Sequence, residues 1–159
     1  MGQTASVLTK GFNHVAVLTA DLERFIDFYK SVFDAELLAT LIDNPGMRMA
    51  GVRIGELAEF NVFELEGNTE HERQVPMFGR GRIDHLAIDA ASLDAFETIR
   101  DRLIERGASD GFVTDFGPIY SCFYVDPDGL ESEVCVGNPD WDGKTFNEPG
   151  TPATRFHPA

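Results

Sequence analysis

The chain repeats one short segment after 71 residues. Residues 12–18 read Phe-Asn-His-Val-Ala-Val-Leu and residues 83–89 read Ile-Asp-His-Leu-Ala-Ile-Asp, which aligns His14 with His85. The same offset aligns two further pairs of apolar residues, Leu22 with Leu93 and Phe25 with Phe96. A repeat of this length predicts a duplicated supersecondary unit and not the shorter period of a solenoid. Two halves related by a pseudo-twofold axis would bring the two histidines to one point.

Composition narrows the class of protein. With 159 residues, 43% of them hydrophobic, the chain suits one compact domain or two small, closely packed halves. A net charge of −14 argues against nucleic acid and anionic membranes as partners, because both need a basic face. No apolar run is long enough to span a bilayer. Two cysteines, Cys122 and Cys135, do not make a disulfide scaffold, so we expect reduced thiols in a cytoplasmic protein.

Each half shows the same order of signals. In the first half, a strand over 12–18 and an amphipathic helix over about 21–33 precede strands near 36–42, 47–54 and 59–66. In the second half, a strand over 82–89 and a helix from the N-cap Ser92 to the C′ residue Gly107 precede strands near 111–116, 119–125 and 130–136. The sequence therefore predicts an α+β fold made of two tandem βαβββ modules.

The expected boundaries follow from these elements. A short lead over 1–10 precedes the first module at 11–66, and a polar linker over 67–81 joins it to the second module at 82–137. Residues 138–159 contain four prolines, which interrupt regular structure, and three aromatic side chains, Trp141, Phe146 and Phe156. We expect this segment to be an ordered but irregular arm.

Strand alternation places four polar side chains, two histidines and two glutamates, on one face. Val15 and Val17 in the first repeat, and Leu86 and Ile88 in the second, should lie under the helices, which leaves His14 and His85 on the opposite, helix-free face. In residues 61–65, Phe63 and Leu65 suit the helix face and Glu64 points away. Glu133 is placed in the same way within 130–135. His14, Glu64, His85 and Glu133 together would suit one divalent ion: Ni²⁺, Zn²⁺, Co²⁺, Mn²⁺ or Fe²⁺.

Other polar residues have weaker indications. If residues 126–129 form a four-residue turn, Cys122 lies opposite Glu133, and Tyr120 and Tyr124 share that face, where they either line a substrate pocket or fill the core. Glu131 is the alternative ligand if a bulge shifts the last strand.

Two arginines, Arg80 and Arg82, flank the second repeat. They would either meet an anionic substrate group or be solvated linker residues.

These motifs resemble the vicinal oxygen chelate superfamily, which contains glyoxalase I, extradiol dioxygenases and bleomycin-binding proteins. The resemblance covers about residues 11–137 and is most specific at 12–17, 21–29, 84–87 and 126–129 leading into Glu133. It implies a half-closed, eight-stranded, barrel-like sheet around a central cavity, with His14, His85 and Glu133 as metal ligands. Glu64 matches the fourth ligand of glyoxalase I-like members. A homodimer is expected by analogy.

Three functions compete at this stage. The first is a metal-dependent lyase or isomerase of glyoxalase I-like type, which acts on a small substrate with vicinal oxygens through an enediolate, with Glu133 or Glu64 as the base. The second is an Fe²⁺ extradiol-type dioxygenase, in which Glu64 would be a spectator, so that Glu64→Ala separates the two enzymes. The third is a metal-free protein that binds a small molecule and confers resistance.

Overall fold

The computed structural model divides the chain into two units, Met1–His71 and Glu72–Ala159, and describes residues 11–143 and 153–158. Unit 1 contains β1 (His14–Leu18), α1 (Leu22–Phe33), β2 (Glu36–Asn44), β3 (Met47–Ile54) and β4 (Ala58–Leu65). A 3₁₀ turn over Glu70–Glu72 follows β4. Unit 2 contains β5 (Ala87–Asp89), α2 (Leu93–Glu105), β6 (Val113–Asp115), β7 (Ile119–Val125), β8 (Glu131–Gly137) and β9 (Thr154–Phe156).

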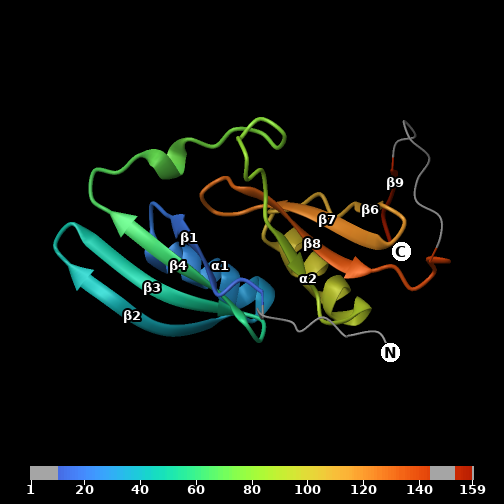
Figure 1. Ribbon diagram of the computed structural model, residues 1–159, viewed down its shortest axis with the longest axis horizontal. Helices are drawn as coiled ribbons and strands as arrows, with labels where there is room; N and C mark the ends of the chain where they lie inside the picture. Colours follow the sequence, from blue (N-terminus) through green and yellow to red (C-terminus); the bar gives the residue numbers. More distant parts are fainter. Residues whose placement is uncertain (1–10, 144–152, 159) are drawn as a thin grey trace, which may run out of the picture. The chain divides into compact units, whose positions relative to one another are not determined.

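Each unit builds one sheet with its helix between the first two strands of the module (Figure 1). The strand order is β1-β4-β3-β2 in unit 1 and β5-β8-β7-β6-β9 in unit 2. In both units the first strand pairs in parallel with the last strand of the module, and the other neighbours pair antiparallel. The prediction of an α+β fold with two βαβββ modules is therefore confirmed.

Local chemistry explains where the helices begin and end. The Asp21 side chain accepts a hydrogen bond from the Arg24 amide at 2.9 Å, and the Ser92 hydroxyl accepts one from the Ala95 amide at 3.1 Å, so both are N-caps. Helix α1 ends at Asp34, which has a φ of 52°, and Gly107 with a φ of 65° follows the end of α2. These two positions have left-handed backbone, which glycine adopts without a steric cost.

Aromatic packing fixes which face of each sheet is covered. The α1 rings of Phe25 and Tyr29 lie 5.7 Å and 4.9 Å from the ring of Phe60 on β4. Phe60 and Val62 are therefore on the helix side of the unit 1 sheet, and both are buried. In unit 2, Phe96 and Leu103 are buried on α2.

Two parts of unit 2 differ from expectation. Strand β5 begins at Ala87 and not at residue 82, because the preceding residues form a loop held by side-chain hydrogen bonds. The arm expected to be irregular contains a strand, β9, which pairs antiparallel with β6. The Phe156 ring packs against Tyr120 at 5.8 Å. Trp141 has no regular secondary structure, and Phe146 lies outside the described residues.

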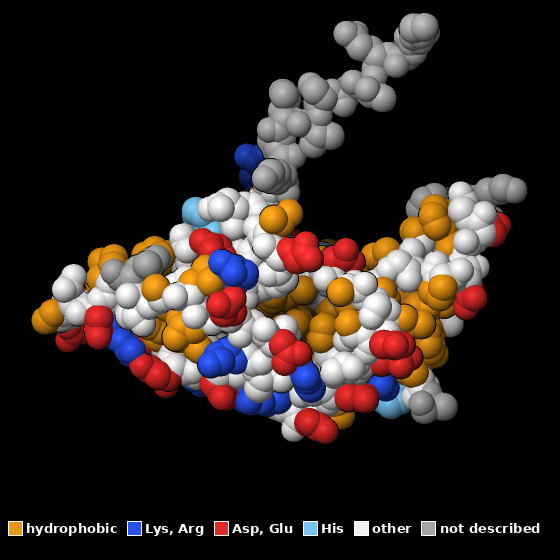
Figure 2. All heavy atoms as spheres, turned by 90° about the horizontal axis from the view of Figure 1, so that it is seen from below, with side chains coloured by type: hydrophobic (Ala, Val, Ile, Leu, Met, Phe, Trp, Pro, Cys, Tyr) orange, Lys and Arg blue, Asp and Glu red, His pale blue; other side chains and the backbone are white. Residues whose placement is uncertain are grey.

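The described surface matches the acidic composition. On the face in Figure 2, acidic side chains are interspersed with arginine and lysine and do not leave a continuous basic patch. Within residues 11–143 and 153–158, no helix has both the length and the apolar character needed to cross a membrane.

Candidate active site

His85 and Glu133 form a close pair on the helix-free face of unit 2. His85 Nε2 lies 3.2 Å from Glu133 Oε1, although the two residues are 48 positions apart in the chain. Glu133 pairs with Ala87 in the parallel β5/β8 ladder, and its amide donates to the Leu86 carbonyl at 2.9 Å, which brings the end of the histidine segment next to β8. Only 11% of the Glu133 side chain and 27% of the His85 side chain are exposed.

Each member of the pair is held by a second partner. His85 Nδ1 lies 2.8 Å from Asp84 Oδ2, and the Ser121 hydroxyl donates to Glu133 Oε2. The hydrogen bond that His85 donates to Asp84 raises the pKa of His85, burial opposes this rise, and the charge of Glu133 adds to it. The same hydrogen bond lowers the pKa of Asp84. The arrangement leaves Nε2 of His85 and Oε1 of Glu133 directed at each other.

The loop that carries Asp84 is tied to β8 by one arginine. Arg80 donates to the Asp84 carbonyl at 3.0 Å, to the Glu131 carbonyl at 2.9 Å and to the Glu131 carboxylate at 3.1 Å. That carboxylate also accepts from the Met77 amide at 2.6 Å. Arg80 is thus a buried structural residue and not a solvated linker arginine, and Glu131 is occupied by it. Strand β8 has no bulge against β7, so the alternative that depended on one is wrong.

Phe78 occupies an unusual position in the same loop. It has a φ of 68°, a left-handed conformation that is uncommon outside glycine, and its side chain is 89% exposed. The Phe78 amide donates to Asp84 Oδ1, and its ring lies edge-on to the His85 ring at 6.5 Å. Asp84 therefore fixes both His85 and the backbone of an exposed aromatic residue.

The equivalent position in unit 1 has a different polar residue. Ala16 pairs with Asn61 in the β1/β4 ladder just as Ala87 pairs with Glu133 in the β5/β8 ladder. Asn61 is thus the structural counterpart of Glu133. His14 is exposed, and its Nδ1 lies 2.9 Å from Asn13 Oδ1, as His85 is paired with Asp84.

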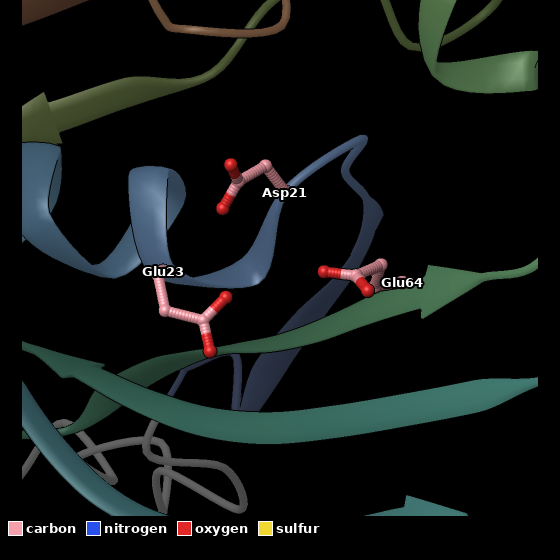
Figure 3. A group of neighbouring side chains, drawn as sticks. All are labelled: Asp21, Glu23 and Glu64. Atoms are coloured by element: carbon pink, nitrogen blue, oxygen red, sulfur yellow. The ribbon is translucent and has the colours of Figure 1, made fainter. Parts of the chain in front are cut away.

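Glu64 lies on the other face of its sheet, and the prediction that it points away from the helix is wrong. Its Oε2 accepts a hydrogen bond from the Leu22 amide at the start of α1, at 2.8 Å. Figure 3 shows it with Asp21 and Glu23, whose carboxylate oxygens approach within 4.8 Å of one another. Arg48 forms ion pairs with both Glu23 and Glu64, and Asp21 caps α1. The backbone amides at the start of α1 and the guanidinium of Arg48 therefore explain why these three carboxylates lie close together.

The three residues predicted to line a substrate pocket share the face of β7 opposite to that of Glu133, but Tyr124 does contribute to the lining of a cleft in unit 2. Cys122 pairs with Val134, Tyr124 with Ser132 and Tyr120 with Val136, whereas Phe123 is the residue opposite Glu133. Cys122 and Tyr124 are fully buried, and burial raises the pKa of the Cys122 thiol. The prediction that Cys122 lies opposite Glu133 is therefore wrong by one residue.

Sequence reasoning missed Asp84 and Ser121 at this site, and it named Arg80 without the structural role that the loop gives it. A signal for Asp84 was present, because each repeated histidine follows an amide or carboxylate side chain, Asn13 or Asp84. Ser121 and Arg80 had no comparable signal, because their roles depend on the β7/β8 register and on the path of the loop.

Comparison with known proteins places the fold in a family. The model of the Glyoxalase/Bleomycin resistance protein/Dioxygenase superfamily matches residues 11–134. The chain belongs to this superfamily. An epimerase from Actinomyces sp., named 2-epi-5-epi-valiolone epimerase, is 27% identical over 141 residues, which cover 77% of this chain and 76% of the epimerase.

Solved structures of superfamily type share the fold. A glyoxylase/bleomycin resistance protein/dioxygenase domain from Frankia sp. EAN1pec has a TM-score of 0.67 and 19% identity, covering 83% of this chain and 95% of that domain. The fosfomycin resistance protein FosX from Listeria monocytogenes, complexed with Mn(II) and sulfate, has a TM-score of 0.59 and 16% identity, covering 86% of this chain and all of FosX. At these identities the likeness concerns the fold alone.

Proposed function

We propose that the protein is a divalent-metal-dependent isomerase or epimerase that moves a proton on a carbon next to a substrate carbonyl. The observation that carries this proposal is the His85–Glu133 pair, whose facing atoms, Nε2 and Oε1, lie 3.2 Å apart. The other ring nitrogen of His85 is hydrogen-bonded to Asp84, and the other carboxylate oxygen of Glu133 accepts from Ser121. The epimerase relative supports a reaction that inverts a carbon centre, and the Mn(II) complex of FosX supports only the choice of a divalent ion. The narrower expectation of a glyoxalase I-type reaction is replaced by this broader one.

The donor atoms fit a divalent ion. A histidine that binds a metal through one ring nitrogen commonly donates a hydrogen bond to a carboxylate through the other, as His85 can to Asp84. The neighbouring oxygen of Glu133 adds a second donor, which gives one nitrogen and one oxygen of a mixed ligand set. His85 and Glu133 would hold the ion, which as a Lewis acid acidifies a carbon beside a bound carbonyl. The expectation that His14 and Glu64 contribute to the same ion remains a prediction, and the helix-side position of Glu64 weighs against its part in it.

Glu133 is also the carboxylate we propose for proton transfer, in which it would release the ion that it helps to hold and take the proton instead. It faces the helix-free side, and Ser121 steadies one oxygen while the other remains directed at His85. Glu64 is a poor alternative because its oxygen accepts from the amide of Leu22 and faces Arg48. For the same reason Glu64→Ala does not separate an isomerase from a dioxygenase.

Metal binding tests the proposal before any substrate is known. Calorimetric titration of the chelator-treated protein with Mn²⁺, Zn²⁺, Ni²⁺, Co²⁺ and, without oxygen, Fe²⁺ should show binding that His85→Ala and Glu133→Gln each weaken by about 100-fold, and Asp84→Asn by about tenfold. His71→Ala is the control and should leave affinity unchanged. Failure of the wild-type protein to bind any of these ions would contradict the proposal.

Turnover distinguishes the remaining classes. The loaded protein should catalyse exchange of a substrate carbon-bound proton with deuterium from D₂O for one member of a panel of hydroxylated cyclic ketones, hemithioacetals and acyl-CoA epimers, and Glu133→Gln should abolish the exchange. Oxygen uptake with catechols would indicate the dioxygenase. Ligand binding by metal-free protein without any exchange would indicate a binding or resistance protein. A homodimer stays a prediction, which light scattering would check.

A further inference from the structure

The C-terminal strand β9 brings an arginine to a cleft next to the His85–Glu133 pair. The cleft belongs to unit 2, has a volume of about 630 Å³, and includes Phe123, Met77, Asp110, Glu131 and Arg155 in its lining. That volume lies within the range of small-molecule sites in proteins.

The sheet register puts the cleft on the same face as Glu133. Phe123 is directly opposite Glu133, one strand away. Arg155 is opposite Thr114, and Thr114 is opposite Ser121, whose hydroxyl donates to Glu133. Neighbouring strands lie about 4.8 Å apart, so β9 is about 14 Å from β8. A ring-sized ligand and the length of an arginine side chain are together enough to bridge this separation.

The position of β9 is fixed by contacts on both sides of Arg155. Its backbone pairs with β6, and Phe156 packs on Tyr120. The next residue, His157, lies 3.1 Å from the buried guanidinium of Arg100. Arg155 therefore stands on a docked strand and not on a loose end.

The charges of the cleft favour an uncharged ligand. Arg155 pairs with Asp110 at 3.0 Å through one terminal nitrogen, and Glu131 pairs with Arg80 at 3.1 Å. The lining itself offers one guanidinium, that of Arg155, and two carboxylates, those of Asp110 and Glu131. Because Arg80 neutralises Glu131 from outside the lining, the remaining charges of Arg155 and Asp110 balance, and donor and acceptor lie side by side, which suits neighbouring hydroxyl groups that both donate and accept. A dianionic phosphate would meet Asp110 and Glu131 as well as the arginine. Phe123 and Met77 supply an apolar wall for ring carbon atoms.

We propose that this cleft, with Arg155 and Asp110 as its polar end, binds the hydroxyl groups of an uncharged polyhydroxylated ring. That such a ring is a substrate, and not only a ligand, rests on the proposed function, because His85 and Glu133 are the groups that would react with it. Binding in the cleft itself requires neither the metal nor turnover, so the two proposals fail separately.

The test is an NMR titration of the full-length, chelator-treated protein with two matched probes, myo-inositol and myo-inositol 1-phosphate. We expect myo-inositol to bind more tightly than its phosphate and to shift the backbone amides of Phe123, Asp110 and Arg155. Arg155→Met, which keeps the aliphatic stem, should weaken myo-inositol binding about tenfold, the effect of losing one good hydrogen bond. Asp110→Asn should weaken myo-inositol binding and strengthen binding of the phosphate, because Arg155 is then unopposed.

Arg53→Met is the matched control. Arg53 pairs with Glu36 at 3.2 Å and its side chain is 46% exposed, close to the 52% of Arg155, but it lies in unit 1. It should leave binding of both probes unchanged. In the Arg155→Met protein without ligand, NMR signals of the β6 and β9 backbone amides at their wild-type positions would show that β9 remains paired with β6. Tighter binding of the phosphate by the wild-type protein, shifts confined to other residues, or no myo-inositol binding at 50 mM would each overturn the proposal.

Discussion

A buried hydroxyl in the sheet of unit 2 should be replaceable with a gain in stability. Thr114 is 5% exposed, and its Oγ1 has no hydrogen-bond partner among the described residues. A buried hydroxyl without a partner costs about 1–3 kcal/mol, and valine has nearly the same shape. We therefore expect Thr114→Val to raise the free energy of unfolding by about 1 kcal/mol, which is about 2–4 °C in Tm for a protein of this size.

Thr19 provides the opposite case in unit 1. It is 2% exposed, and its hydroxyl both donates to the Asp21 carbonyl at 3.1 Å and accepts from the Asp21 amide at 3.2 Å. Thr19→Val should therefore lower the free energy of unfolding by about 1 kcal/mol. Urea denaturation of both variants, with unchanged m values, measures the two shifts. If Thr114→Val destabilised the protein as much as Thr19→Val, the reasoning about an unpartnered hydroxyl would be refuted.

Three further predictions concern the pair and its supports. Arg80→Gln should lower the free energy of unfolding by about 2 kcal/mol, because it removes the charged hydrogen bonds of a buried guanidinium that holds the loop to β8, whereas Arg82→Gln on the exposed surface should have almost no effect in the same urea assay. In metal-free protein, Asp84→Asn should lower the pKa of His85 in an NMR titration. Because the folded-state pKa of His85 is raised, its pairing with Asp84 stabilises the wild-type protein fully below the pKa of free histidine, about 6.5, and this contribution is lost as the pH rises through the folded-state pKa. The difference in unfolding free energy between the wild type and Asp84→Asn should follow the same pH dependence. Burial raises the pKa of Cys135 to about 12, so iodoacetamide at pH 8 should label this thiol only after unfolding, and labelling of the native protein would contradict its burial.

The order of elements and one histidine–glutamate pair could be predicted because they depend on local patterns. The repeated strand segments, the N-cap Ser92 and the C′ glycine each have a local chemical signal, and the structure confirms the elements they predict. The face of Glu133 could be predicted because Leu130 and Val134, on either side of it in the sequence, are apolar residues that suit the helix face. His85 then approaches Glu133 through the parallel pairing of β5 with β8.

The face of Glu64 could not be read from β4 alone. Residues 60–65 contain apolar side chains at both alternating sets of positions, so periodicity does not say which set lies under the helix. Contacts of Phe60 with the rings of α1 decide the matter, and they put Glu64 on the helix side. These contacts depend on tertiary packing, which a strand pattern does not contain.

The β7/β8 turn shows how a small length difference reverses a prediction. A four-residue turn over 126–129 would have paired Val125 with Leu130, but Val125 pairs with Glu131. Because side chains alternate, this shift of one residue moves Cys122 to the helix face and brings Phe123 opposite Glu133. The turn residues predict a turn, but they do not determine its length.

Duplication of the fold has been followed by specialisation of the two halves. Each unit keeps a histidine after a polar residue, but position 61 holds an amide where position 133 holds a carboxylate. An amide cannot take up a proton near neutral pH and is a weak metal ligand, so Asn61 cannot take the part that we propose for Glu133 in unit 2. The additional parts that support the pair, the Arg80 loop and strand β9, also belong to unit 2. Asn61→Glu would therefore place a carboxylate in unit 1 at the position of Glu133, but without the supporting loop of Arg80 that unit 2 provides.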